Sequence, residues 1–250
     1  MIEIEGLVKR FGDRTAVAGL DLKVGNGEIF GFLGPNGAGK TTTVKLITGL
    51  LKPDAGRVRV AGFDVASQTI EAKRAMGLVP DEPFVYPKLT GAEYLRFVGE
   101  LYGVPLAGIR TRTPELLEMF ELAPWGGELV ESYSHGMRQK LVLAGILLHE
   151  PKVLVLDEPL VGLDPKSGRL VKEIFLRLAG RGTTIFMCTH VLEIAEKLCD
   201  RVGIMVSGRM IACGTVPELE ASAQKPGSDL EDLFLSLTGG AEYAALLRYL

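Results

Sequence analysis

A nine-residue stretch near the N-terminus has the composition and spacing of a phosphate-binding loop. Residues 34–42 read GPNGAGKTT and fit the pattern G-x-x-x-x-G-K-[ST]. The glycines let the backbone fold around one anion, and a helix that begins near Lys40 directs its positive end at the same point. Lys40 is expected at the β- and γ-phosphates, and the Thr41 hydroxyl at a Mg²⁺ ion. The residues expected around the phosphates are Gly34, Pro35, Asn36, Gly37, Ala38, Gly39, Lys40, Thr41 and Thr42.

Two adjacent carboxylates mark a second candidate segment, residues 153–158 (VLVLDE). The four apolar residues predict a fully buried parallel strand, with Asp157 and Glu158 at its carboxyl end. Neighbouring carboxylates repel each other unless a cation or a polarised water offsets the repulsion. An Asp157 that binds Mg²⁺ and a Glu158 that acts on water fit the phosphate loop, whereas acids at a surface turn are the alternative.

Two further polar side chains follow predicted buried strands. His190 comes after residues 183–188 (TTIFMC), and Asp81 comes after residues 76–79, between two prolines. Ligands of open α/β sheets commonly bind beyond the carboxyl ends of strands, so His190 is expected to contact a γ-phosphate. For Asp81 two interpretations stay open: a Mg²⁺ ligand that acts through a bound water, or a residue that supports the turn.

Phe11 and Ser134 lie at positions that each allow two interpretations. Phe11 lies at the turn between strands predicted at 2–9 and 16–24, where an aromatic side chain is either a core anchor or a stacking surface for a purine. Ser134 precedes an apolar helix predicted at 137–148. With Gly136 it either holds an anion at the helix start or forms a plain N-cap.

The elements that position these residues are short buried strands and amphipathic helices. Between residues 86 and 140 the periodicity becomes helical: Thr90-Gly91-Ala92-Glu93 is a capping box, and Thr113-Pro114 is expected to open another helix. The strands are expected at 2–9, 16–24, 28–33, 56–62, 76–79, 153–158, 183–188, 201–206 and 210–214, with 56–62 as an edge strand.

The C-terminal part is expected to be a helical tail. Residues 222–228 are interpreted as a polar linker, and the apolar spacing of 230–237 predicts a helix that docks on the body or on a partner. A further short helix is expected at 241–250. The domains are then expected to be a P-loop α/β core with an antiparallel β element (1–85 and 141–215), a helical subdomain (86–140) and the tail (216–250).

The composition indicates a globular cytoplasmic protein. With 47% apolar residues and a formal net charge of −3 over 250 residues, the chain lacks the basic balance of an extended nucleic-acid surface. The apolar region 141–163 is interrupted by charged residues, which excludes a membrane span, and the N-terminus alternates like a strand rather than a signal peptide. Cys188, Cys199 and Cys213 lack metal spacing and are interpreted as reduced core residues.

Taken together, these motifs resemble the ATP-binding subunit of an ABC transporter over nearly the whole chain. Phe11 stands at the place of the adenine-stacking aromatic, and His190 at that of the switch histidine. Two departures stand out: Tyr133 and His135 replace the leucine and first glycine of the signature, and Asp81 replaces the Q-loop glutamine. The matching segments are 34–42 with the Walker A loop, 133–140 (YSHGMRQK) with the LSGGQ signature, 153–159 (VLVLDEP) with Walker B and 160–165 (LVGLDP) with the D-loop.

The resemblance implies ATP and Mg²⁺ as cofactors and a head-to-tail dimer, either homo- or heterodimeric. Glu158 would polarise the attacking water and His190 would contact the γ-phosphate, while Asp157 lies behind the Mg²⁺ ion. Ser134 and Gly136 would act on the nucleotide of the opposite subunit. Hydrolysis would drive an integral membrane permease on a separate chain, which places this chain on the inner face of the cell membrane. Residues 229–239 (DLEDLFLSLTG) resemble the tail of exporter subunits and favour export over import.

Two other protein classes fit less of the chain. A P-loop GTPase would need the guanine-reading N-K-x-D, but the only asparagines, Asn26 and Asn36, are not followed by lysine. A kinase would leave the 133–140 segment unexplained. An ABC ATPase that acts on nucleic acid or ribosomes typically carries a long coiled-coil or zinc insert, and none is visible, so no nucleic acid is expected as a partner.

Overall fold

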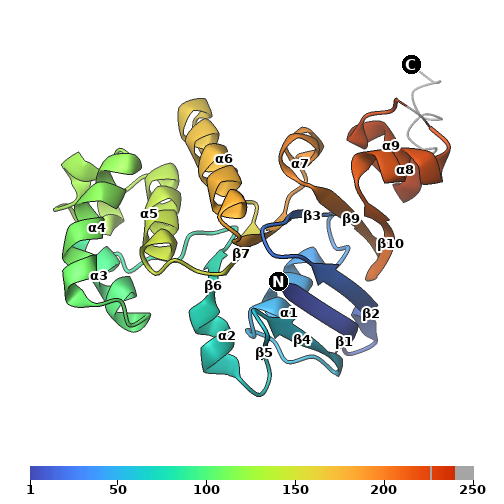
Figure 1. Cartoon of the computed structure of the whole chain (residues 1–250), viewed down its shortest axis with the longest axis horizontal. Helices are drawn as coiled ribbons and strands as arrows, with labels where there is room; N and C mark the ends of the chain where they lie inside the picture. Colours follow the sequence, from blue (N-terminus) through green and yellow to red (C-terminus); the bar gives the residue numbers. More distant parts are fainter. Residues whose placement is uncertain (226, 240–250) are drawn as a thin grey trace.

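The computed structural model describes residues 1–225 and 227–239, which form two β-sheets surrounded by helices (Figure 1). The strands are β1 (Ile2–Phe11), β2 (Arg14–Val24), β3 (Ile29–Leu33), β4 (Ala55–Val60), β5 (Phe63–Asp64), β6 (Met76–Val79), β7 (Val153–Asp157), β8 (Thr184–Cys188), β9 (Arg201–Val206) and β10 (Arg209–Gly214). Within the described residues one sheet has the order β2-β1-β4-β5 and is antiparallel, and the other has the order β10-β9-β3-β8-β7-β6. Only β10 runs antiparallel in the second sheet. The expected α/β class is therefore confirmed.

The helices are α1 (Lys40–Ile47), α2 (Thr69–Ala75), α3 (Gly91–Leu101), α4 (Leu106–Met119), α5 (His135–Leu148), α6 (Pro165–Gly180), α7 (Leu192–Leu198), α8 (Val216–Ala223) and α9 (Leu230–Thr238). The capping box before α3 is confirmed, since Thr90 accepts a hydrogen bond from the Glu93 amide and Glu93 accepts one from the Thr90 amide. In Figure 1, α3 and α4 lie at one end of the molecule, and α8 and α9 at the other. The boundary expected at residue 140 falls inside α5.

The prediction that Thr113-Pro114 opens a helix is wrong. Helix α4 begins at Leu106 and continues through Pro114. The buried residues Ile109 and Leu116 lie on either side of the proline, so one apolar stripe packs along the whole helix. Packing of that stripe outweighs the one i→i−4 hydrogen bond that proline removes.

Two other expectations are also wrong, and one lies outside the described residues. The strand expected at an edge, β4, lies between β1 and the two-residue β5, because Arg59 and Val60 pair with Asp64 and Phe63. The linker expected from residue 222 begins later, because α8 continues to Ala223. The helix expected at 241–250 falls outside the residues that the structure describes.

Burial on both faces explains why the central strands read as unbroken apolar runs. Alternate residues of β7 enter different cores: Leu154 and Leu156 pack with α3, α4 and α5, whereas Val153 and Val155 pack with the antiparallel sheet and α1. The sheet is thus held between two layers, and its strand ends are fixed in position.

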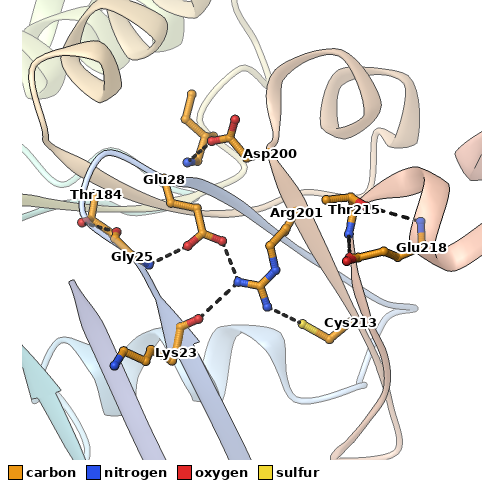
Figure 2. A network of polar contacts seen from close by, with 10 residues as sticks. Lys23, Gly25, Glu28, Thr184, Asp200, Arg201, Cys213, Thr215 and Glu218 are labelled. Atoms are coloured by element: carbon orange, nitrogen blue, oxygen red, sulfur yellow. Dashed lines mark hydrogen bonds and ion pairs between the residues drawn. The ribbon is translucent and has the colours of Figure 1, made fainter.

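A polar network fixes the start of β3, the strand that leads into the phosphate loop (Figure 2). The Glu28 carboxylate accepts hydrogen bonds from the Gly25 amide at 2.5 Å and from Arg201 Nη1 at 2.8 Å. Arg201 also donates to the Lys23 carbonyl and to Cys213 Sγ, each at 3.4 Å. The network joins β2, β3, β9 and β10. Cys213 is exposed, so its interpretation as a core residue is wrong.

Helix α9 docks on the body of the protein rather than projecting from it. Leu230 and Leu233 are fully buried and pack with Leu33, Ala195 and Leu219. The sequence predicted docking either on the body or on a partner, and the structure shows the helix on the body. None of the helices in the described part of the chain is both long and apolar enough to cross a membrane.

Candidate active site

A cleft of about 370 Å³ lies beside the phosphate loop (residues 34–42). The hairpin register pairs Phe11 with Arg14, so the turn of the antiparallel sheet presents both side chains to the cleft. Phe11 is 50% exposed, which excludes the core-anchor interpretation and leaves its ring free to stack on a flat ligand. The lining residues are Phe11, Arg14, Ala16, Asn36, Gly37, Gly39, Lys40, Thr41 and Thr42.

The phosphate loop is closed by its own lysine and connected to the β9–β10 turn. Lys40 Nζ donates hydrogen bonds to the Gly34 carbonyl at 2.6 Å and the Pro35 carbonyl at 3.2 Å. The Gly208 amide donates to the Ala38 carbonyl at 2.8 Å, which connects the loop to the β9–β10 turn. Gly39 has φ +113°, and a Cβ there would collide with the Ala16 carbonyl oxygen, so only glycine fits.

The first turn of α1 is open to an anion. Gly39 precedes the helix, and within the described residues no side chain caps α1 and no acid lies in its first turn. The free amides and the positive end of the helix dipole therefore favour a negatively charged ligand, and Lys40 and Arg14 add positive charge at the same cleft. A nucleoside triphosphate suits this cleft, with its base stacked on Phe11 and its phosphates at the N-terminus of α1.

Three carboxylates converge at the carboxyl ends of β6 and β7. Asp157 is only 6% exposed, and burial is the largest cause that raises the pKa of this carboxyl, followed by the charges of Asp81 and Glu158. The Thr41 hydroxyl and the Lys40 ammonium act in the opposite direction on the pKa of Asp157. The structure therefore brings Asp81, which is exposed, near enough for its charge to act on the carboxylate of Asp157.

The residues at this point suit a Mg²⁺ ion shared with a nucleotide. No group of three or more His, Cys, Asp or Glu side chains among the described residues is arranged to hold a metal by itself. Mg²⁺ commonly takes only one or two carboxylates and completes its shell with phosphates and water. A buried carboxylate whose charged form is disfavoured, next to the Thr41 hydroxyl, fits that arrangement.

Glu158 is held by the two residues that follow β8. His190 Nδ1 lies 2.7 Å from Glu158 Oε1, and the Thr189 hydroxyl donates to Glu158 Oε2 at 3.1 Å. Glu158 has φ +50°, which is a strained conformation for a non-glycine residue. Such conformations occur most often at functional sites. Its side chain is 14% exposed, whereas that of His190 is 63% exposed. The pair has the geometry of a base and the group that orients it.

Ser134 and Gly136 lie in a different part of the chain from the cleft lining. Ser134 is the N-cap of α5, and its hydroxyl accepts a hydrogen bond from the Met137 amide at 3.3 Å. A Cβ on Gly136 would lie 3.1 Å from the carbonyl oxygen of Gly162, so α5 begins against the 160–165 turn. Tyr133 is buried and donates to the Trp125 carbonyl at 2.7 Å.

Sequence reasoning missed two residues of the site. Arg14 lines the cleft and donates to the Gly37 carbonyl at 3.1 Å, and Thr189 orients Glu158. The pairing of Arg14 with Phe11 across a short turn was a usable signal for the first. For Thr189 the signal was a hydroxyl directly before the candidate histidine.

The comparisons with known proteins agree with this chemistry. The sequence pattern of a family described as ABC transporter matches residues 17–161. The chain is 43% identical to the daunorubicin resistance ATP-binding protein DrrA3 of Streptomyces coeruleorubidus, over 98% of this chain and 77% of that protein. It is 42% identical to a Nod factor export ATP-binding protein I of Ralstonia nicotianae, over 88% of this chain and 68% of that protein. A solved structure of an ATP-binding subunit of an ABC transporter superposes with a TM-score of 0.91 at 31% identity, covering 95% of this chain and 99% of that one.

Proposed function

This chain belongs to the family of ABC transporter ATP-binding subunits, and from that membership we propose that it hydrolyses Mg-ATP to power a separate membrane permease that exports its substrate. The observation that carries the proposal is the meeting of an open helix N-terminus, Lys40 and the exposed Phe11 at one cleft, with Glu158 held by His190 nearby. The curated relatives named for drug resistance and for Nod factor export support the direction of transport.

Nucleotide binding is assigned to the cleft residues. The adenine ring stacks on Phe11, and the phosphates replace the loop carbonyls as partners of Lys40 Nζ, while the α1 amides donate to phosphate oxygens. Thr41 and Asp157 are the residues that would hold Mg²⁺, which when bound neutralises charge on the β- and γ-phosphates.

Hydrolysis is assigned to Glu158 and His190. The Glu158 carboxylate takes up a proton as water attacks the γ-phosphorus, and the bond to the ADP oxygen breaks to give ADP and phosphate. Thr189 and His190 hold both carboxylate oxygens, so the base is positioned before the water arrives.

The site is complete only in a dimer under this proposal. Ser134 and Gly136 do not line the cleft of their own chain, so we assign them to the nucleotide of a second ATP-binding subunit. The helical region 86–140 carries them on α5.

We assign the permease contact to an exposed aromatic patch formed by Phe84, Tyr86 and Phe97. Phe84 is 75% exposed, and the rings form an edge-to-face series with centroid separations of 5.9 Å and 5.0 Å. Exposed apolar patches commonly mark protein interfaces. Phe84, the first residue of the patch, directly follows the turn that carries Asp81, so a membrane protein docked there can act on the catalytic carboxylates. The chain would then lie at the cytoplasmic face of the membrane.

Glu158→Gln tests the catalytic assignment. Turnover should fall by about 100-fold or more because water activation is lost, while ATP still binds and bridges two subunits. Phosphate release measures the first effect, and size-exclusion chromatography in Mg-ATP measures the second. Glu150→Gln is the matched control, since Glu150 also has a positive φ but pairs with Arg112. A Glu158→Gln variant that stays monomeric at every ATP concentration and turns over normally would contradict the assignment.

The partner assignment has its own test. Membranes that contain the permease should bind the wild-type chain and lose most binding when Phe84 and Tyr86 are both changed to Ser. Phe11→Ser is the control, because Phe11 is also an exposed aromatic but lies at the nucleotide cleft. Equal membrane binding by all three proteins, or co-purification with nucleic acid in place of the membrane protein, would contradict the assignment.

A further inference from the structure

We propose that Phe234, on the C-terminal helix α9, is a positioning residue that keeps His190 against Glu158 and thereby sets the rate of ATP hydrolysis. The inference rests on the proposed function for its kinetic consequence, but the effect of Phe234 on the position of His190 is testable without hydrolysis. It assigns a role at the active site to the tail, the part of the chain that lies farthest from the phosphate loop in sequence.

A second cavity, of about 280 Å³, joins the tail to the active site. Its polar lining includes both residues that hold Glu158, and Phe234 is the member contributed by the C-terminal helix. The cavity shares Asn36 with the nucleotide cleft. The lining residues are Gly34, Pro35, Asn36, Thr189, His190, Leu192 and Phe234.

Helix α9 holds Phe234 in place through contacts of the residues that precede it. Leu230 and Leu233 are fully buried, and the Leu230 amide donates to Glu196 Oε1 of α7 at 3.3 Å. The Asp229 carboxylate caps the helix by accepting from the Asp232 amide at 2.8 Å. Phe234 lies one turn after Leu230 on the same side of the helix, so its ring has a fixed place beside α7.

His190 has few contacts of its own. Its side chain is 63% exposed, and the one hydrogen bond that its ring makes to the described residues is that to Glu158. It lies between β8 and α7, and Leu192, the first residue of α7, lines the same cavity as Phe234. Phe234 forms one wall of that cavity and packs in the same apolar cluster as Leu192. Its ring therefore limits how far the start of α7, and with it the imidazole two residues earlier, moves away from Glu158. Loss of the ring enlarges the space on that side.

Phe234→Ala should therefore lower kcat by about 3- to 10-fold while KM for Mg-ATP changes by less than about 2-fold, because a small misplacement of an orienting group affects the chemical step rather than binding. Phe234→Tyr keeps the ring and should restore most of the rate. Steady-state phosphate release against ATP concentration separates the two constants.

Leu237→Ala is the matched control. Leu237 is on the same face of α9 and packs in the same apolar cluster, but it does not line the cavity. Both alanine variants lose apolar contacts and should melt at a lower temperature, yet only Phe234→Ala should change kcat. Equal kcat values for the two alanine variants would overturn the proposal, since a general loosening of the tail would then explain both.

An NMR measurement tests the effect of Phe234 on His190 in the protein without nucleotide. The chain has three histidines, His135, His149 and His190, so the imidazole Hε1 signal of His190 is the one that a His190→Gln variant lacks. Phe234→Ala should shift or broaden the signal of His190 and leave the other two in place. An unchanged His190 signal overturns the inference. If the wild-type chain fails to hydrolyse ATP, the proposed function fails, while this measurement still decides whether Phe234 holds the histidine.

Discussion

The N-termini of α1 and α5 differ in whether a side chain of the same protein accepts hydrogen bonds from their first-turn amides. At α1, Gly39 offers no side chain, and the amides of the first turn open into the nucleotide cleft. At α5, the Ser134 hydroxyl already accepts from the Met137 amide, and the helix start packs against the 160–165 turn. An uncapped helix end needs a ligand or water for its amides, whereas a capped one is stable without either.

We infer from this difference that the α1 region binds the nucleotide and that the α5 region acts on a nucleotide already bound. The α1 region holds the charge, the amides and the aromatic ring that bind a nucleotide within one chain. The α5 region contributes no residue to the cleft lining, and under the proposed function it acts on a nucleotide brought by another subunit. Changes at α1 should therefore abolish binding, whereas changes at α5 should affect hydrolysis at the partner's site.

The largest effect is expected from Lys40→Ala. It removes the charge that faces the β- and γ-phosphates, and hydrogen bonds to charged groups predict a loss of about 10- to 100-fold in ATP affinity. Isothermal titration with ATP measures the loss. Lys45→Ala is the control, because Lys45 lies exposed in the last turn of the same helix. Wild-type affinity in Lys40→Ala would remove the basis for treating α1 as the binding region.

The next effect concerns action between subunits. Ser134→Arg and Lys40→Ala each inactivate both sites of their own dimer, but a mixed dimer has one composite site with neither change. Random mixing should restore about a quarter of the wild-type sites, since half of the dimers are mixed and each has one intact site. ATPase activity of the mixture measures the recovery. If mixed dimers form, as shown by mass spectrometry of tagged chains, and no activity returns, the two helix ends do not share a nucleotide.

The sequence predicted the contiguous phosphate loop more completely than the contacts that other segments make with the site, for a physical reason. The phosphate loop is contiguous, and each of its glycines is required by backbone geometry, so residues 34–42 alone define the site. The β7 acids and His190 were found because parallel strands end at the same edge of a sheet. Arg14 and Thr189 were missed because their roles depend on contacts between segments distant in sequence: the Gly37 carbonyl for one and Glu158 for the other.

The helical region 86–140 also shows that local patterns were predicted and long-range packing was not. A capping box is a local signal, and the one at Thr90 was read correctly. The start of α4 was misplaced because Pro114 usually marks a first turn, whereas packing of residues on both sides of it decided the outcome. The role proposed for α9 depends on Phe234 and His190 lining one cavity, which no local pattern encodes.

A smaller effect is expected on folding, at the contact between the α5 start and the 160–165 turn. Gly162 has φ +77°, and a Cβ there would lie 2.6 Å from Cδ2 of His135. Gly162→Ala should destabilise the protein by about 1–3 kcal/mol, through backbone strain and the collision together. In a His135→Gly background the collision is absent, so the cost should be smaller. Urea denaturation of the four proteins gives the coupling, and equal costs in both backgrounds would show that His135 does not constrain the turn.

The smallest effect is expected at Asp81, which belongs to neither helix end but whose charge acts on Asp157. Its charge raises the pKa of Asp157, so the two carboxylates are close enough to repel each other. A cation between them turns that repulsion into attraction, and Mg²⁺ prefers charged oxygens. Because Asp81 is exposed, its interaction is screened by water, and a shift of only about 2- to 5-fold is expected.

Asp81→Ala should therefore raise the Mg²⁺ concentration for half-maximal ATPase activity by that factor, while metal-free nucleotide binding stays nearly unchanged. A Mg²⁺ titration at saturating ATP measures the midpoint. Glu82→Ala is the matched control, since Glu82 is the adjacent exposed acid and is not among the charges that chiefly raise the pKa of Asp157. Asp81→Gln adds a neutral oxygen on a longer arm and separates the contribution of charge from that of the ligand atom. If the midpoint is the same in all four proteins, Asp81 supports the turn between Pro80 and Pro83, and the ion depends on Thr41, Asp157, phosphates and water.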